Sequence, residues 1–244
     1  MTTDPEYLTF DHVLFYGREY NEVLEMFGLS EANLAGKKIL DCPSGPDSFV
    51  AEAHARGFDV TGCDPLYAKS GIEILIQGEK DIRFSWDESK KYPAQMGNMD
   101  IDDFHRRKLA ALDRFGKDYD AGCAEGRYQA ASLPTLPFED KTFDLVISAN
   151  MLFTYSSTET GGLLPTEIFD LDFHLRSVRE LIRVSRKEVR LYPVMTNHAK
   201  KHLHPYAAQI VGKLAADGIK MNFIESSYSQ TSCTGHLMLV IDCE

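Results

Sequence analysis

Two aspartates, Asp41 and Asp64, each stand at the end of a short apolar run. A carboxylate there can accept hydrogen bonds from a ribose diol or pair with an ammonium group, whereas it repels phosphate. The turn after Asp41 holds a single glycine, Gly45, and its prolines Pro43 and Pro46 remove two amide donors. Neither a G-x-G-x-x-G fingerprint nor a P-loop is present. The pattern disfavours a ligand held by its phosphates and favours an adenosyl ligand that carries an amino acid.

The segments around these aspartates predict a βαβ unit. Residues 38–42 (KILDC) and 59–63 (DVTGC) are short β runs, and residues 48–56 between them are typical of a helix that ends at Gly57. Such a unit belongs to a parallel sheet with a right-handed crossover. Taken alone, Asp64 is equally well interpreted as the N-cap of a following helix.

Further β runs extend this sheet. The run at residues 143–149 (FDLVISA) is almost entirely apolar, which is typical of a strand covered on both faces. We therefore predict an α/β fold with a Rossmann-like, doubly wound, mostly parallel sheet of seven strands, closed by an antiparallel C-terminal hairpin. The other predicted elements are strands at 127–130, 188–192, 220–224 and 236–241 and a helix at 172–184.

Two segments lie outside the alternation of strands and helices. Residues 11–27 predict a helix, within an N-terminal helical segment at 1–35. About 60 residues separate the second strand from the third, where a dozen suffice for a crossover. We interpret residues 66–120 as an inserted helical cap on a single domain of residues 1–244. The cap's apolar positions at helical spacing are Ile72, Leu75 and Ile76, then Ile101, Phe104, Leu112 and Phe115.

The residues that follow each strand are the candidate site, because ligands of open α/β sheets bind outside the carboxyl ends of the strands. The cofactor candidates are Asp41, Pro43, Ser44 and Gly45 after the first strand, Asp64, Pro65 and Leu66 after the second, Ser132 and Leu133 after the third, and Asn150, Met151 and Phe153 after the fourth.

Four segments resemble class I S-adenosylmethionine-dependent methyltransferases, in the family's order and spacing. The segment LPFEDKTFDLV is the most specific of them, since it matches an L-P-F-x-D-x-x-F-D-x-V run that ends in the fourth strand. Within the family the chain is most similar to an uncharacterised bacterial branch. The matching segments are KKILDCPSGPDSF (37–49), DVTGCDP (59–65), RYQAASLPTLPFEDKTFDLVISANMLF (127–153) and VRELIRVSRKEVRLYPV (178–194).

This resemblance implies S-adenosylmethionine as the cofactor and implies which part of the cofactor each candidate residue contacts. Asp41 matches the acid that faces the methionine amino group, Gly45 the glycine under the ligand, and Asp64 the acid that binds the ribose hydroxyls. Pro65 and Leu66 then lie beside the adenine, Ser132 and Leu133 at the adenine amine, and Asn150, Met151 and Phe153 near the methyl group. The chain departs from the family at Pro43 and Asp47, which replace glycines, and at Ser132, which replaces an acid.

Composition limits the partners. The 244 residues include 26 basic and 37 acidic side chains, a net charge of −11 that disfavours nucleic acid. No apolar run is long enough to span a membrane, and the acidic N-terminus does not look like a signal peptide. We therefore expect a cytoplasmic protein with no membrane or nucleic-acid partner. Five cysteines without a C-x-x-C pair predict no metal site, and the oligomeric state stays open.

The predicted function is methyl transfer to a small-molecule acceptor by in-line displacement. Such a transfer needs alignment more than a catalytic side chain, so no catalytic residue is assigned. Tyr16, His12, Tyr67 and Tyr155 lie near the predicted pocket, where we expect them mainly as wall residues. The alternative is a non-catalytic cofactor-binding or interaction module, and a nicotinamide oxidoreductase ranks third because its fingerprint is missing.

Two charged clusters are expected on the solvated surface. One is the histidine group His198, His202 and His204, which lacks an acid or cysteine to complete a metal site. The other is the basic run at residues 106–108, which lies beside acids and is typical of an exposed helix face.

Overall fold

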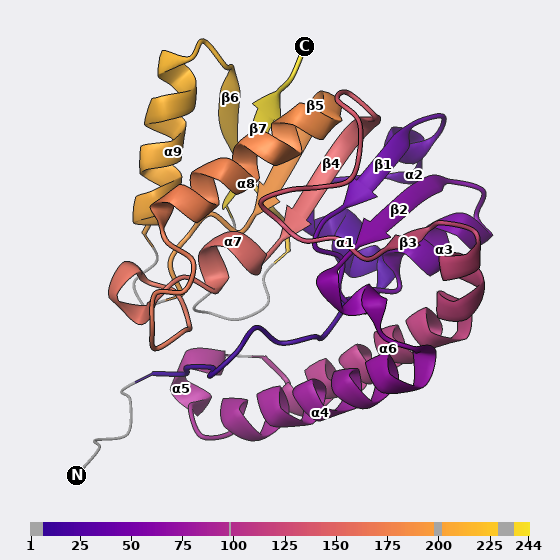
Figure 1. The fold of residues 1–244 in the computed structure, drawn as a ribbon. Helices are drawn as coiled ribbons and strands as arrows, with labels where there is room; N and C mark the ends of the chain where they lie inside the picture. Colours follow the sequence, from indigo (N-terminus) through magenta and orange to yellow (C-terminus); the bar gives the residue numbers. More distant parts are fainter. Residues whose placement is uncertain (1–6, 98, 198–201, 229–236) are drawn as a thin grey trace.

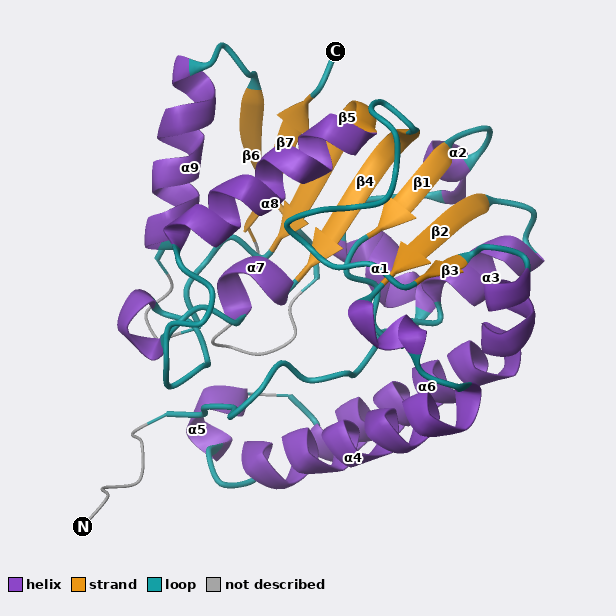
Figure 2. Ribbon diagram, viewed as in Figure 1, coloured by secondary structure: helices purple, strands orange, loops and turns teal. Residues whose placement is uncertain are grey.

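The structure is a computed structural model that describes residues 7–97, 99–197, 202–228 and 237–244. Its centre is a seven-stranded sheet in the order β3-β2-β1-β4-β5-β7-β6, in which β7 runs opposite to the other six strands (Figure 2). The predicted α/β doubly wound sheet with an antiparallel C-terminal pair is therefore confirmed. The strands are β1 (Lys38–Asp41), β2 (Asp59–Cys63), β3 (Tyr128–Gln129), β4 (Phe143–Ala149), β5 (Ser185–Tyr192), β6 (Met221–Glu225) and β7 (Leu237–Asp242).

Helices lie on both sides of this sheet (Figure 1). In that view α8 and α9 cross the near face, whereas α1 and α3 lie behind the strands. The helices are α1 (Tyr20–Met26), α2 (Glu31–Leu34), α3 (Phe49–Ala55), α4 (Gly71–Ser89), α5 (Pro93–Met96), α6 (Ile101–Ala124), α7 (Met151–Thr154), α8 (Leu171–Val184) and α9 (Pro205–Ala216), with 3-10 turns at Pro65–Ala68 and Thr158–Thr160. In the described part of the chain, no helix is both long and apolar enough to cross a membrane.

Alternating side chains of the central strands build two cores. Ile39 of β1 belongs to the core that α1 and α3 cover, together with Val50. Its neighbour Leu40 points to the other face, into the core formed with Val178 of α8 and Ile210 of α9. Because a strand presents successive side chains to opposite faces, β1 is buried on both sides, as its apolar run predicts.

The long insertion after β2 forms helices α4, α5 and α6. Two glycines let α4 and α6 pack closely, since a Cβ on Gly78 would lie 2.7 Å from Leu112 and one on Gly116 would lie 2.6 Å from Leu75. The helix α6 also packs against α3 and β3, so the pair extends one layer of the fold beyond the sheet. The predicted helical insertion is thus present. Its division as a cap at 66–120, the 1–35 segment and the single-domain assignment stay predictions.

The predicted helix over 11–27 is wrong for residues 11–19, which we call the strap. The strap has no helical or strand structure, and α1 begins only at Tyr20. Figure 1 shows it as an indigo trace that runs between the carboxyl ends of the strands and the α4–α6 pair. Together with Leu8 and Phe10, the strap joins a third apolar cluster that includes residues of α5 and of the segment after α7.

Distant partners hold the strap out of a helix. The Phe15 amide donates to the Asp81 carboxylate of α4 at 2.8 Å, so it is not available to a helical carbonyl. The Leu14 amide donates to the hydroxyl of Tyr155 at 3.2 Å. Gly17 lies so close to the β1–α3 loop that a Cβ there would be 2.2 Å from the Pro46 carbonyl oxygen. Tertiary hydrogen bonds and close packing therefore override the helical spacing of the strap's apolar residues.

Candidate functional site

Two adjoining cavities lie at the carboxyl ends of the parallel strands. The larger has a volume of about 290 Å³ and the smaller about 60 Å³. Both are found where β1 lies between β2 and β4, the point at which the strand order reverses and ligands of open α/β sheets bind. The residues that line both cavities are Val13, Leu14, Pro43, Asp64 and Met151.

The sequence candidates converge on these cavities from all four strand ends. Two of the twelve do not line either cavity: Asp41, which lies buried beneath the loop, and Phe153, which packs against the rings of His174 and His204. The candidates that do line a cavity are Pro43, Ser44, Gly45, Asp64, Pro65, Leu66, Ser132, Leu133, Asn150 and Met151.

Asp64 is positioned by two loops at once. Its Oδ1 accepts from the Leu66 amide at 2.9 Å, which caps the turn after β2, and its Oδ2 accepts from the Gly45 amide at 3.2 Å. The side chain is 7% exposed, and burial raises its pKa to about 6 although both amides favour the charged form. Asp64 is thus an N-cap, as the structural interpretation of the sequence allowed, and it also lines both cavities. Each carboxylate oxygen keeps a second lone pair for a ligand.

The loop after β1 is a compact variant turn. Gly45 has a φ of +55°, a left-handed conformation that glycine adopts without a Cβ clash. Tyr67 donates its hydroxyl to the Gly45 carbonyl, and Ser44 donates its hydroxyl to Asp41 at 3.0 Å. Burial, together with the negative charge of Asp47, raises the pKa of Asp41 well above its usual range. Asp41 therefore stabilises the loop through its hydrogen bond with the Ser44 hydroxyl.

The larger cavity is an apolar slot. Leu66 and Leu133 face it from the ends of β2 and β3, and Ser132 supplies one hydroxyl at its wall. Phe169, just before α8, and Phe173, in the first turn of α8, complete the cavity; the sequence analysis did not name either as a site residue. An apolar cavity whose wall includes one buried carboxylate suits an aromatic ring joined to a sugar that carries hydroxyl groups.

The smaller cavity is polar. Arg18 and Asp47 line it together with Asn150, Tyr16 and Tyr155. With the Asn150 amide oriented so that its oxygen faces Arg18, this oxygen accepts from the guanidinium at 3.0 and 3.3 Å. Asn150 has a φ of +58°, which is uncommon for a residue other than glycine, although asparagine adopts positive φ more readily than most; residues in sparsely populated conformations cluster at functional sites.

Beneath the polar cavity lies a buried group of charges that joins the strap to α1 and α6. Glu22 of α1 binds Arg107 and, at 3.5 Å, Lys108. Burial is the largest single influence and opposes ionisation of Glu22, but the charges of Lys108, Arg18 and Arg107 and a backbone hydrogen bond together outweigh it and lower the pKa to about 2. Burial also lowers the pKa of Lys108 to about 7 and raises that of Asp47 to about 7. The expectation that residues 106–108 form a solvated face is wrong for Lys108, which is buried.

The four weak catalytic candidates separate into two groups. Tyr16 and Tyr155 line the polar cavity, whereas His12 and Tyr67 line neither cavity. Tyr155 accepts a hydrogen bond from the Leu14 amide, and burial raises its pKa well above the ordinary value, so it stays protonated at neutral pH. The contact of Tyr155 is that of a wall residue, while the expectation that all four are wall residues stays a prediction.

The histidine group is not a solvated cluster as a whole. His204 is fully buried, caps α9 by accepting from the Tyr206 amide at 3.1 Å, and contacts the Ser156 hydroxyl at 2.8 Å. His202 is exposed, and His198 lies outside the described residues. Because the Nδ1 of His204 accepts, its Nε2 carries the proton and donates to Ser156.

No family model matches the chain. The uncharacterised protein MJ0045 of Methanocaldococcus jannaschii is 27% identical over 210 residues, which cover 81% of this chain and 85% of that protein.

Two solved structures are similar to this chain in their fold. The magnesium protoporphyrin IX methyltransferase of Synechocystis, with bound SAM, is 12% identical; the match covers 91% of this chain and 77% of that one, with a TM-score of 0.44. The PH0226 protein of Pyrococcus horikoshii is 15% identical, with 91% and 90% covered and a TM-score of 0.43.

Proposed function

We propose that this protein binds S-adenosylmethionine in the two adjoining cavities and transfers its methyl group to a small-molecule acceptor. The observation that carries the proposal is the buried carboxylate of Asp64, which lines both an apolar slot and a polar cavity at the switch point of the sheet. The resemblance of the segments after β1, β2 and β4 to class I methyltransferases points to the same ligand.

The chain's own residues fit the two ends of such a ligand. Leu66 and Leu133 offer apolar contact to an adenine ring, and Asp64 offers a buried acceptor to ribose hydroxyls. At the polar end, Arg18 and Asp47 present opposite charges to an amino acid, which carries a carboxylate and an ammonium. The turn after β1 presents no glycine-rich cradle for a pyrophosphate, which disfavours a dinucleotide.

In this proposal the protein acts mainly by orientation. The bound cofactor supplies a methyl group on a sulfonium, which is already an activated leaving group. Tyr16, Asn150 and Met151 line the polar cavity that holds the amino acid of the cofactor. The acceptor then reaches the methyl group beside Asn150 and Met151, where the resemblance places that group. The strap covers the strand ends and keeps water out. Holding nucleophile, methyl carbon and sulfur in line can contribute roughly 7–11 kcal/mol to the rate.

The covering of the site supports a small-molecule acceptor. Residues 13 and 14 of the strap line both cavities, so the strap and the α4–α6 pair restrict access to the strand ends. A cavity covered in this way accommodates a small or medium-sized molecule better than a folded protein or a duplex. The net charge of −11 also disfavours nucleic acid.

A methyl-transfer screen tests this function. Purified protein is incubated with heavy-methyl S-adenosylmethionine and a small-molecule extract of the native host, and products are detected by mass. We expect heavy methyl in a small metabolite, and loss of that signal in the Asp64→Ala variant. Cofactor binding without any transfer would favour the non-catalytic module, and transfer to RNA or protein would overturn the acceptor class.

A further inference from the structure

The side chain of Asn150 is oriented by the buried guanidinium of Arg18. The amide oxygen accepts from the two terminal nitrogens of this guanidinium at 3.0 and 3.3 Å. Arginine has five N–H donors and no acceptor, and it stays protonated in proteins, so it selects this one orientation of the amide. The two N–H donors of Asn150 then lie on the side away from Arg18. Because Asn150 lines the polar cavity, this end of the site is a donor of hydrogen bonds.

Backbone hydrogen bonds hold both partners of this contact in place. The Asn150 amide donates to the Tyr192 carbonyl at 2.6 Å, and the Asn150 carbonyl accepts from the Thr154 amide at 3.1 Å. The Arg18 carbonyl accepts from the Ser48 amide at 2.9 Å. Although Asn150 is the N-cap residue of α7, its side chain makes no cap hydrogen bond. Its oxygen therefore serves Arg18 rather than its own helix.

A second donor comes from the other end of α7. Tyr155 is the C-cap residue of this helix, is 4% exposed and also lines the polar cavity. Its oxygen accepts from the Leu14 amide at 3.2 Å, which leaves the hydroxyl hydrogen to be donated. Among the residues that the structure describes, no acceptor takes this hydrogen. The two ends of α7 thus present an amide donor and a hydroxyl donor to one small cavity.

Each charged side chain that lines this cavity already has a role in the proposed function. Asp64 binds the ribose, Asp47 the ammonium of the cofactor, and Arg18 its carboxylate. None of them is left to remove a proton from the acceptor, and Tyr155 stays protonated because burial raises its pKa. An acceptor that is already ionised needs no base, and carboxylic acids are ionised above about pH 4. The polar cavity therefore favours a carboxylate over a hydroxyl or an amine.

We propose that the methyl acceptor is a small carboxylic acid and that the product is its methyl ester, an inference that rests on the proposed function. One carboxylate oxygen accepts from Asn150 and Tyr155, and the other forms a bond to the methyl carbon. As this bond forms, the bond between carbon and sulfur breaks and its electron pair stays on sulfur. The cofactor leaves as the neutral thioether S-adenosylhomocysteine. No proton is taken up or released in this step.

The charges near the methyl group also favour an anion. Arg18 carries a positive charge beside Asn150, and the sulfonium of the bound cofactor carries a second. A carboxylate is attracted by both, and this attraction is strong where water is excluded. An ammonium would be repelled by both charges. Its N–H groups would also meet the donors of Asn150 and Tyr155 instead of an acceptor.

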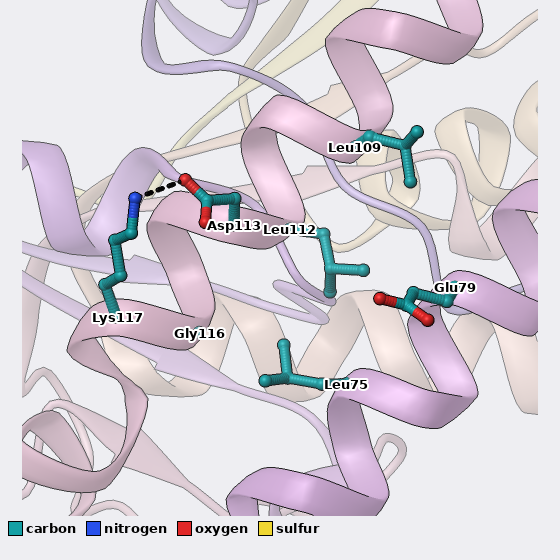
Figure 3. A pocket seen from close by; sticks show the side chains of 7 residues that line it. All are labelled: Leu75, Glu79, Leu109, Leu112, Asp113, Gly116 and Lys117. Atoms are coloured by element: carbon teal, nitrogen blue, oxygen red, sulfur yellow. Dashed lines mark hydrogen bonds and ion pairs between the residues drawn. The ribbon is translucent and has the colours of Figure 1, made fainter.

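The groove between α4 and α6 offers no such position (Figure 3). It has a volume of about 400 Å³, but none of its lining residues lines the two adjoining cavities. Figure 3 shows that its cation, Lys117, is directed to Asp113, and the two are 2.6 Å apart. A carboxylate would meet an ammonium that is already paired, with Glu79 on the same groove. Lys117 therefore supplies a control for loss of a cation outside the site.

The first test measures binding of acceptor probes without turnover. The natural protein is saturated with S-adenosylhomocysteine and titrated by calorimetry with benzoate, benzyl alcohol and benzylamine, and with hexanoate, hexanol and hexylamine. We expect each carboxylate to bind at least about tenfold more tightly than the alcohol or amine of the same skeleton. Equal or weaker binding of the carboxylates, or none, overturns the proposal. A protein that does not bind S-adenosylhomocysteine contradicts the proposed function instead, before any probe is added.

The second test removes the donors. Asn150→Asp replaces the N–H groups by an oxygen, and aspartate tolerates the positive φ at this position. Affinity of the S-adenosylhomocysteine complex for benzoate should fall at least about tenfold, while affinity for S-adenosylhomocysteine stays within about threefold. Tyr155→Phe should weaken benzoate binding in the same way. Asn222→Asp on the exposed face of β6 and Lys117→Glu are the controls and should bind benzoate as the parent does. An equal loss of affinity for S-adenosylhomocysteine in Asn150→Asp would place the donors at the cofactor and overturn the proposal.

The third test identifies the bond that forms in the methyl-transfer screen. Alkali releases the heavy methyl of an ester as methanol, whereas a methyl ether or methylamine is stable. Transfer to a carboxylate should release no proton in weakly buffered solution, whereas transfer to a hydroxyl or an amine releases one for each methyl group. We expect alkali-labile label and no acidification. Label that is stable to alkali, with one proton released for each transfer, overturns the proposal and leaves the methyltransferase function intact.

Discussion

Replacing Asp64 by asparagine separates the two roles of this side chain. The amide oxygen of asparagine can still accept from the Leu66 amide, so the cap is retained, while the charge that a ribose diol would bind is lost. A hydrogen bond to a charged acceptor contributes about 1.5–3 kcal/mol, against about 0.5–1.5 for a neutral one. Two such bonds therefore predict an affinity for S-adenosylhomocysteine lower by roughly 10–100-fold.

The stability of the same variant should change far less. The folded-state pKa of Asp64, about 6, lies above the ordinary value of 3.8, so its charge destabilises the folded protein. That cost is absent at low pH, grows between pH 4 and 6, and reaches about 3 kcal/mol above pH 6. Asparagine removes it, but the Gly45 amide loses its acceptor at a cost of about 1–3 kcal/mol. The two effects offset each other.

The affinity of the natural protein for its ligand should depend on pH, and the raised pKa of Asp64 sets the direction. Hydroxyl donors stabilise the charged carboxylate, so ligand binding lowers the pKa of Asp64 and releases a proton near pH 6. The contribution of Asp64 to the affinity should be constant above pH 7 and fall by about tenfold at pH 5, while ionisation of Asp47, whose pKa is about 7, adds a separate change near pH 7. Asp64→Asn should remove most of this dependence.

Isothermal titration calorimetry in buffers of different ionisation heat, with thermal unfolding alongside, measures all three quantities. Asp59→Asn is the matched control, because Asp59 is exposed at the opposite end of β2. An Asp64→Asn variant with unchanged affinity and a lower unfolding temperature would refute the ribose role and leave Asp64 as a cap alone.

Three further predictions concern the strap and the helices beside it. Gly17→Ala should destabilise the protein by at least about 2 kcal/mol in urea unfolding, because the new Cβ would collide with the Pro46 carbonyl; unchanged stability would contradict the packing of the strap. Asp81→Ala leaves the Phe15 amide without its acceptor, which should cost about 1–3 kcal/mol and accelerate hydrogen exchange at that amide; slow exchange there would contradict the contact. Adding S-adenosylhomocysteine should slow hydrogen exchange in α4 and α6 with little change in β7, and unchanged exchange in both helices would remove their role as a lid.

The strands could be predicted from sequence because their signals are local. An almost unbroken apolar run such as β4 needs cover on both faces, whichever helices provide it. The helix α9 carried a local signal that the sequence analysis overlooked: Pro205 at its first turn, followed by Tyr206, Ile210 and Leu214 at a spacing of four.

The strap could not be predicted, because its partners are remote in sequence. Asp81 lies 66 residues from Phe15, and Tyr155 lies 141 residues from Leu14. Helical spacing in such a segment shows only which residues are apolar. No local pattern indicates that the amides of the strap donate hydrogen bonds to side chains far away in the sequence. Burial of Lys108 has the same origin, since it depends on Glu22 in a different helix.

The candidate site was located because the ends of parallel strands meet at one edge of the sheet. This rule placed ten of the twelve candidates at the cavities. It could not identify residues that reach the site from elsewhere, such as Arg18 from the strap and Phe173 from α8. It also could not tell that Phe153, at the exit of β4, turns into the core beside His174.

A direct binding titration tests the central claim. S-adenosylmethionine, S-adenosylhomocysteine and NAD are titrated separately into the natural protein by calorimetry, with thermal shift as a second readout. The account predicts dissociation constants of about 1 µM, or about −8 kcal/mol, for the two adenosyl amino acids and no binding of NAD. Absence of heat and of a thermal shift with millimolar S-adenosylhomocysteine, or tight binding of NAD in its place, would contradict the assignment of the cavities.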